Sequence, residues 1–195
     1  MRELKRSFLV GKIVPAFIFF VLWLDGSLLP LILLPILYVI LVEKKRLSYL
    51  GFSQNSFRQS LVLGLVIAVI LSGQYYLIFN YYLPNILNPK AINFYDVFTD
   101  IVHYPLYEEV AYRSFFLTHY AELDRHLLST RNLAANCVQS LLFVAVHKHH
   151  FSTPLILIPV FLLAFLNGVN YLKTKNIYGC ILAHSLLNSY ALALR

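Results

Sequence analysis

Apolar residues in this chain are gathered into long runs that are separated by short polar stretches. A helix that crosses a lipid bilayer needs about 20 predominantly apolar residues, and several of these runs approach or exceed that length. No stretch has the pattern of a β-strand. The pattern predicts an all-α fold, a polytopic transmembrane helical bundle of about six to seven helices. The expected spans are residues 8–24, 28–42, 61–83, 97–120, 132–146, 154–172 and 177–194.

Two parts of this pattern are less regular than the rest. The run at residues 28–42 is short and contains Pro30 and Pro35, so a kinked or partly inserted helix is expected there. Residues 84–96 are rich in turn-forming proline and asparagine. They are therefore expected to form a loop on the outer side of the membrane.

Positive charge lies at the ends of the apolar runs. The chain has 16 Lys and Arg against 9 Asp and Glu, a formal net charge of +7, and basic residues gather near the start and in residues 43–58 and 173–176. Lysine and arginine mark the cytoplasmic ends of membrane helices, so this distribution predicts topology rather than a nucleic-acid-binding surface. We expect an integral protein of a prokaryotic plasma membrane, surrounded by lipid, with its N-terminus in the cytoplasm.

One expected span, residues 97–120, carries charge in mid-membrane. A charged side chain at the bilayer centre costs roughly 2.5 to 3.5 kcal/mol, so Glu108, Glu109 and Arg113 need partners. Glu109 and Arg113 are four residues apart, in the favourable order for a structural ion pair. Glu108 points about 100° away from Glu109 and is expected to face other neighbours and to act as the reactive acid. Three further histidines without an evident partner are interpreted as structural: His103, His119 and His126.

Two later runs carry further polar side chains. His184 and Asn188 are four residues apart and reach into the same space from one helix. They are donors of the kind that stabilise an oxyanion, although such groups also hold membrane helices together. His147 ends its run, where it either meets the membrane interface or assists Glu108 by holding a water molecule or relaying its proton.

Three motifs in separate apolar runs together resemble those of a known protease family. They are Glu108-Glu109-x-x-x-Arg113, Phe143-x-x-x-His147 and His184-x-x-x-Asn188. In this order they resemble the CPBP family of intramembrane proteases, the CAAX proteases and bacteriocin-processing enzymes that are also called the Abi family. The resemblance covers about residues 60–195. The chain departs from the common pattern at Tyr112, at Ser114 and in residues 148–150.

The resemblance implies a role for each motif residue. Glu108 and His147 would activate the attacking water, Arg113 would hold the glutamate pair, and His184 and Asn188 would form the oxyanion hole. It implies a glutamate-dependent intramembrane endopeptidase, related to the type II CAAX prenyl endopeptidase, with no obligatory metal or other cofactor. The implied partner is a peptide or protein substrate, with prenylated and membrane-associated chains among the candidates.

One domain of two parts is expected. Residues 1–58 would form an N-terminal hydrophobic hairpin with a cytoplasmic loop, and residues 59–195 would form the catalytic transmembrane core. Cys137 and Cys180 lie within apolar runs, which predicts small buried side chains rather than a disulfide.

Three other functions are compatible with some of these residues. A zinc-dependent membrane protease could use Glu108, His147 and His184 as ligands, but the His-Glu-x-x-His helix of zinc proteases is missing and Arg113 would oppose a cation. A transporter with a proton relay would favour an inverted repeat, which the sequence lacks. A bacteriocin immunity or scaffold protein would keep the same fold without cutting a substrate, and this alternative stays open.

Overall fold

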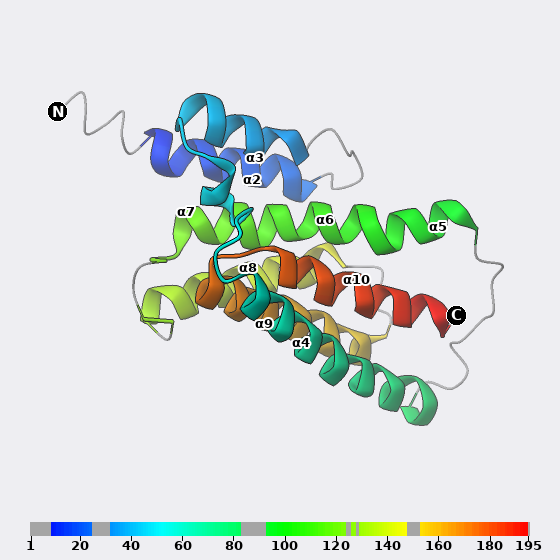
Figure 1. Ribbon diagram of the computed structural model, residues 1–195. Helices are drawn as coiled ribbons and strands as arrows, with labels where there is room; N and C mark the ends of the chain where they lie inside the picture. The colour runs from blue at the N-terminus through cyan, green and yellow to red at the C-terminus, as the bar shows by residue number, and fades with distance from the viewer. Residues whose placement is uncertain are drawn as a thin grey trace.

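The computed structural model describes residues 9–24, 32–82, 93–123, 126–127, 129–147 and 153–194. Within these ranges the regular structure is helical and no strand is present, as the apolar runs predicted (Figure 1). Several helices contain wider π turns, labelled η together with the short 3₁₀ helix η4. The elements are η1 Leu9–Ile13, α2 Val14–Leu24, α3 Leu33–Leu37, η3 Tyr38–Val42, η4 Leu47–Leu50, α4 Phe57–Leu77, η5 Ile78–Tyr82, α5 Phe94–Phe98, η6 Thr99–His103, α6 Tyr104–Glu108, η7 Glu109–Leu117, α7 Thr118–Tyr120, α8 Thr130–Val146, α9 Pro154–Thr174 and α10 Tyr178–Ala193.

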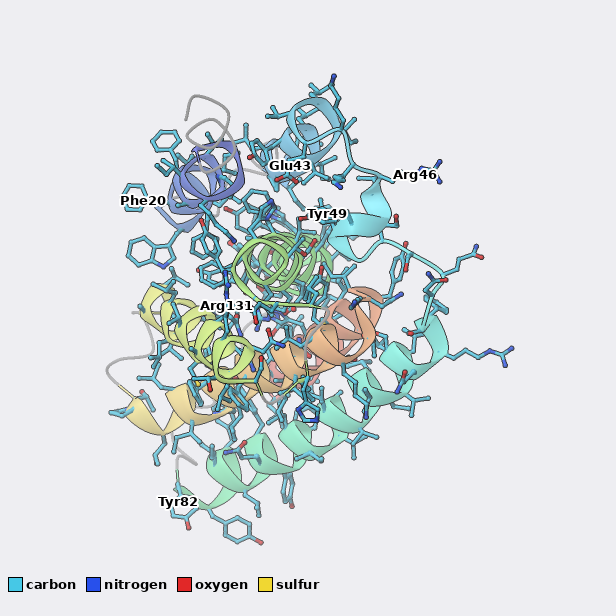
Figure 2. The ribbon with its side chains drawn as sticks, turned by 90° about the vertical axis from the view of Figure 1, so that its left-hand side faces the viewer. Phe20, Glu43, Arg46, Tyr49, Tyr82 and Arg131 are labelled. Atoms are coloured by element: carbon cyan, nitrogen blue, oxygen red, sulfur yellow. The ribbon has the colours of Figure 1, made fainter. Side chains whose placement is uncertain are left out.

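A long helix, residues 94–120, runs through the middle of the bundle and comprises α5, η6, α6, η7 and α7. On one side it carries the N-terminal hairpin of α2 and α3, and on the other it meets a layer of α4, α8, α9 and α10 (Figures 1 and 2). The helix begins at Phe94, so the prediction that residues 84–96 form a loop throughout is wrong. Asn93 and Asp96 form a reciprocal capping box, which satisfies backbone donors of the first turn.

The N-terminal hairpin is anchored to the long helix and to α8 by side-chain hydrogen bonds. The Tyr107 hydroxyl donates to the carbonyl oxygen of Leu22 at 2.6 Å, and the indole of Trp23 donates to the carbonyl oxygen of Leu142 at 3.2 Å. Pro35 lies in the first turn of α3, where its missing N–H has no intrahelical partner to lose. Pro30 lies outside the described residues.

Small residues bring α4 and α10 into backbone contact. A Cβ atom on Gly64 would overlap the backbone of Gly179, and one on Gly179 would overlap Ser60. The Ser60 hydroxyl accepts from the Gly179 N–H at 3.1 Å. Close packing of small residues is how membrane helices associate when lipid supplies no hydrophobic drive between them. Of the two cysteines, which are both free, Cys180 is buried and Cys137 is partly buried.

Several connections that were predicted to share one side of the membrane meet at one end of the bundle. The Asn176 side chain donates to the carbonyl oxygens of Ser53 at 2.7 Å and Asn55 at 3.1 Å. At the same end, Glu43 contacts His119 at 3.1 Å. His119 was predicted to lack a partner, and this prediction is wrong, since it contacts Glu43. The two residues are 76 positions apart, so helix spacing gives no signal for this contact.

Two helices among the described residues are long and apolar enough to cross a membrane by length and composition, Phe57–Tyr82 and Pro154–Thr174. Shorter apolar helices cover Gly11–Trp23 and Leu33–Val42. Large apolar side chains stay exposed on the outer surface of α4, with Val62 at 62% and Val69 at 64%. Such a surface is unfavourable in water and fits a helical bundle whose outside faces lipid.

Candidate active site

The ion pair predicted from the four-residue spacing lies at the centre of the bundle. Arg113 Nε is 3.2 Å from Glu109 Oε2, and both side chains are fully buried. These two atoms form an ion pair without hydrogen-bond geometry. The guanidinium also lies over the ring of Phe143, 4.5 Å from its centroid. The buried positive charge is therefore balanced by a carboxylate and by the face of an aromatic ring.

The other oxygen of Glu109 connects the long helix to two more helices. Glu109 Oε1 lies 2.9 Å from His184 Nδ1 on α10 and accepts a hydrogen bond from Asn167 Nδ2 on α9 at 3.2 Å. A carboxylate oxygen accepts, so His184 Nδ1 carries a proton. Sequence reasoning missed Asn167. The available signal was a polar amide side chain inside an uncharged apolar run.

Glu108 contacts the same imidazole from its other side. Glu108 Oε2 lies 3.7 Å from His184 Nε2, which is an ion-pair distance beyond hydrogen-bond range. The prediction that the two adjacent glutamates face different neighbours is wrong. Both glutamates have ordinary α-helical backbone angles, and they share a neighbour because the His184 ring offers Nε2 to Glu108 and Nδ1 to Glu109. The two carboxylates differ in access instead, because Glu108 is 17% exposed and Glu109 is fully buried.

His147 and Asn188 flank this cluster. His147 follows the last turn of α8, and its Nδ1 lies 2.7 Å from the carbonyl oxygen of Phe143. The Phe143 ring packs against both imidazoles, with centroid distances of 4.6 Å to His147 and 5.9 Å to His184. Asn188 lies one turn beyond His184 and donates to the carbonyl oxygen of Asp100 at 2.7 Å.

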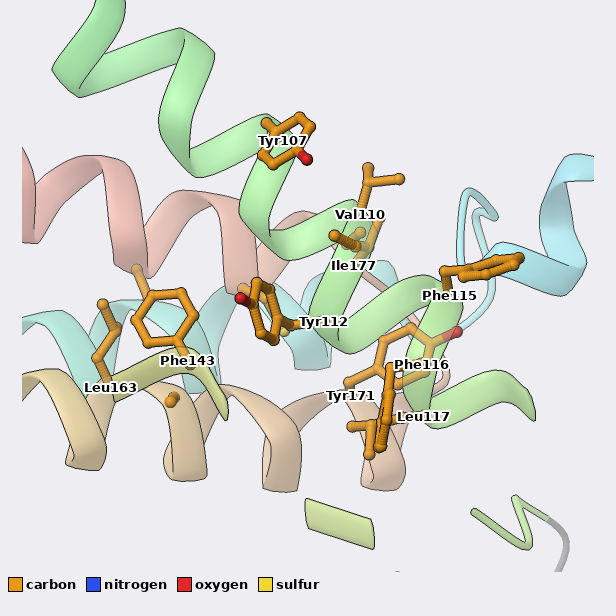
Figure 3. Packing of buried hydrophobic residues seen from close by; sticks show 14 of the residues in the cluster. Tyr107, Val110, Tyr112, Phe115, Phe116, Leu117, Phe143, Leu163, Tyr171 and Ile177 are labelled. Atoms are coloured by element: carbon orange, nitrogen blue, oxygen red, sulfur yellow. The ribbon is translucent and has the colours of Figure 1, made fainter. Parts of the chain in front are cut away.

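Aromatic and aliphatic side chains surround the cluster. The rings of Tyr112 and Phe143 meet edge to face with centroids 5.2 Å apart, and Leu163 of α9 belongs to the same buried cluster (Figure 3). All three side chains are buried. Tyr112 also meets Phe19 of the hairpin at 5.2 Å, so the first helix helps to close this side of the site. Low local polarity strengthens the electrostatic contacts inside it.

A metal centre has little support from this arrangement of donors. In the part of the chain that the structure describes, no three His, Cys, Asp or Glu side chains gather as a metal site would require. Of the three suggested zinc ligands, Glu108 and His184 lie 3.7 Å apart, while the Nδ1 atom of His147 lies against the carbonyl oxygen of Phe143.

The fold and the cluster define a polytopic helical membrane protein with a buried carboxylate, imidazole and guanidinium site. Residues 90–190 match a family model described as type II CAAX prenyl endopeptidase Rce1-like. This match covers more than half of the chain, and the chain belongs to that family. Membership supports a CAAX-protease-like function with a peptide or protein substrate. No curated protein and no solved structure matches the chain.

The matched segment contains every candidate site residue. It begins just before the long helix and ends within α10, leaving out the hairpin and α4. The resemblance based on motifs had included α4, which packs against α9 and α10 but supplies none of the site's polar contacts described above.

Proposed function

We propose that this chain is an intramembrane endopeptidase in which Glu108 activates the water that attacks a peptide carbonyl. The observation that carries the proposal is the difference between the two adjacent carboxylates. Glu109 is fully buried and engaged by Arg113, His184 and Asn167. Glu108 is 17% exposed, and its buried Oε2 lies 3.7 Å from His184 Nε2 without a hydrogen-bond partner among the described residues, which leaves this oxygen able to bind a water molecule.

The reaction then needs one base and two donors. Glu108 takes a proton from water as the water oxygen bonds to the peptide carbonyl carbon, and His147 assists by holding that water. The negative charge that forms on the carbonyl oxygen is stabilised by His184 and Asn188. When the carbon–nitrogen bond breaks, Glu108 returns its proton to the leaving amine, which gives a free carboxylate and a free amine.

The hydrogen bonds of the two donors are compatible with this role. When His184 Nε2 carries a proton, its nearest acceptor is Glu108 Oε2, and an oxyanion bound between the two would replace that long contact. Asn188 uses one N–H to hold Asp100, and its amide has a second one for the substrate.

His147, which packs against the Phe143 ring, is suited to hold the water. Its Nδ1 faces the backbone carbonyl of Phe143 and serves as the donor, so Nε2 is the basic nitrogen of the neutral ring. We place the catalytic core in residues 59–195 and treat residues 1–58 as an accessory hairpin. The N-terminus would lie in the cytoplasm of a prokaryotic cell, and prenylated or membrane-associated peptides are the favoured substrates.

The test compares Glu108→Gln with wild type as purified, folded proteins and in cells. Protein termini in membranes from cells that express each form would reveal cleaved substrates, and the purified proteins would then be tested on peptides spanning those sites. Loss of cleavage in Glu108→Gln with unchanged thermal stability supports the proposal. Glu122→Gln changes a surface carboxylate paired with Arg131 and is the matched control. Full activity of Glu108→Gln would exclude the mechanism, and a wild type that cleaves nothing would favour the immunity or scaffold function.

A further inference from the structure

We infer that Asn167 is a positioning residue of the site, which fixes Glu109 and, through Glu109, the tautomer of His184. The inference concerns α9, which none of the three sequence motifs includes. It deepens the proposed peptidase function and rests on it for the activity measurements below.

The contacts of Asn167 leave one orientation for its amide. The side chain is fully buried, and its Nδ2 lies 3.2 Å from Glu109 Oε1 and 3.0 Å from the carbonyl oxygen of Cys180. The opposite orientation would set an amide oxygen against two oxygen acceptors. The Cys180 thiol donates back to the carbonyl oxygen of Asn167 at 3.2 Å. Asn167 therefore joins α9 to α10 and donates to Glu109 at the same time.

This hydrogen bond sets the contacts of the two carboxylate oxygens of Glu109. Oε2 faces Arg113, while Oε1 is held between Asn167 Nδ2 and His184 Nδ1. With Nδ1–H bound to Glu109, Nε2 is the nitrogen that faces Glu108, and it donates to an oxyanion once it also carries a proton. Asn167 thus acts on His184 through Glu109, without touching substrate.

The next asparagine on the same helix provides a matched control. Asn170 is also buried, and its Nδ2 donates to the carbonyl oxygen of Ser60 on α4 at 3.1 Å. The two residues share residue type, helix and burial. They differ in their partner, since Asn167 meets the site carboxylate and Asn170 meets backbone outside the site.

The activity test compares Asn167→Leu with Asn170→Leu in the full chain, because leucine has the branched shape of asparagine without its hydrogen-bonding groups. For Asn167→Leu, kcat is expected to fall at least about tenfold with KM within about twofold of wild type, as for a lost hydrogen bond to a charged group. For Asn170→Leu, kcat should stay near the wild-type value while the melting temperature falls. Asn167→Ala provides the same readout if leucine does not fit.

A second measurement does not depend on cleavage. ¹⁵N NMR of histidine-labelled protein, with the His184 signals assigned by their loss in His184→Gln, reports which ring nitrogen carries the proton. Wild type and Asn170→Leu should show the Nδ1–H form of His184, and Asn167→Leu and Asn167→Ala should show a changed mixture.

Two results would overturn the inference. One is an unchanged His184 tautomer together with an unchanged kcat in both Asn167 variants. The other is an equal loss of kcat and melting temperature in Asn167→Leu and Asn170→Leu, since that would make both residues structural. If wild type cleaves no peptide, the proposed function fails, whereas the NMR comparison still decides the inference.

Discussion

The long helix contributes one residue to each of two carboxylate–imidazole pairs. The pairs differ in what the second nitrogen of the histidine ring faces. In mid-bundle, His184 Nδ1 lies 2.9 Å from Glu109. At the end of the bundle, His119 Nε2 lies 3.1 Å from Glu43, a residue that Figure 2 shows above the end of the long helix. Both histidines are almost completely buried, so burial and an acidic partner alone do not distinguish a reactive histidine from a structural one.

The second nitrogen makes the distinction. His119 Nδ1 lies 2.7 Å from the carbonyl oxygen of Phe115 in its own helix, so both sides of the ring are occupied at hydrogen-bond distance. His184 Nε2 instead faces the partly exposed Glu108 at 3.7 Å, too far for a hydrogen bond and close enough for a reacting group to bridge them. We therefore treat the His119 pair as a helix-end brace and the His184 pair as part of a reaction site.

The largest expected effect comes from substituting the two adjacent glutamates one at a time. Glu108→Gln should lower kcat by about 10²- to 10⁴-fold, as for the loss of a general base, with little change in melting temperature. Glu109→Gln should lower stability as well, by about 3 to 5 kcal/mol, because it leaves the buried Arg113 charge without its partner. The measurements are steady-state kinetics and thermal unfolding in one detergent. Equal destabilisation by both substitutions would contradict the division of roles.

Asn188 gives the next largest effect and separates an oxyanion donor from a residue that only holds helices together. Asn188→Ala should lower kcat by about 10²- to 10³-fold if its amide contacts the oxyanion. Ser189→Ala is the control, because the Ser189 hydroxyl donates only to its own helix, to Ser185. A melting temperature that falls in Asn188→Ala while kcat stays constant would assign Asn188 to the contact with Asp100 alone.

Local helix geometry explains which of these contacts the sequence could predict. The Glu109–Arg113 pair follows from a four-residue spacing within one helix. Asn167 and Glu109 are 58 residues apart, so their contact depends on how α9 packs. The neighbours of Glu108 were predicted wrongly because the partner that it shares with Glu109, His184, lies on α10, and the packing of α10 has no signal in the spacing within one helix.

The fold was easier to predict than the site. Apolar run length depends on bilayer thickness and hardly on tertiary contacts, so the predicted spans correspond to the observed helices. Helix starts depend on single residues. The capping box of Asn93 and Asp96 begins the long helix within the stretch predicted to be a loop, and α4 begins at Phe57, ahead of its predicted start.

The helix-end brace should affect stability without affecting the reaction. Glu43→Gln removes the charged partner of His119, and we expect unfolding to become easier by about 1 to 2 kcal/mol while kcat and KM keep their wild-type values. Thermal unfolding and peptide cleavage measured on the same preparation test both halves. A fall in kcat at unchanged stability would mean that a change at the end of the long helix alters the site.

The smallest expected effect is that of a metal chelator on peptide cleavage. His184 faces a carboxylate with each nitrogen, Glu109 is held by three side chains, and the Nδ1 atom of His147 lies 2.7 Å from the carbonyl oxygen of Phe143. A zinc ion would have to displace these contacts next to the positive charge of Arg113. We therefore expect EDTA and 1,10-phenanthroline to leave kcat unchanged and metal analysis to find less than one zinc per active molecule. Stoichiometric zinc that is lost together with activity would replace the carboxylate-based mechanism with a zinc-based one. The two carboxylate–imidazole pairs would then differ by a bound metal rather than by the contact of the second ring nitrogen.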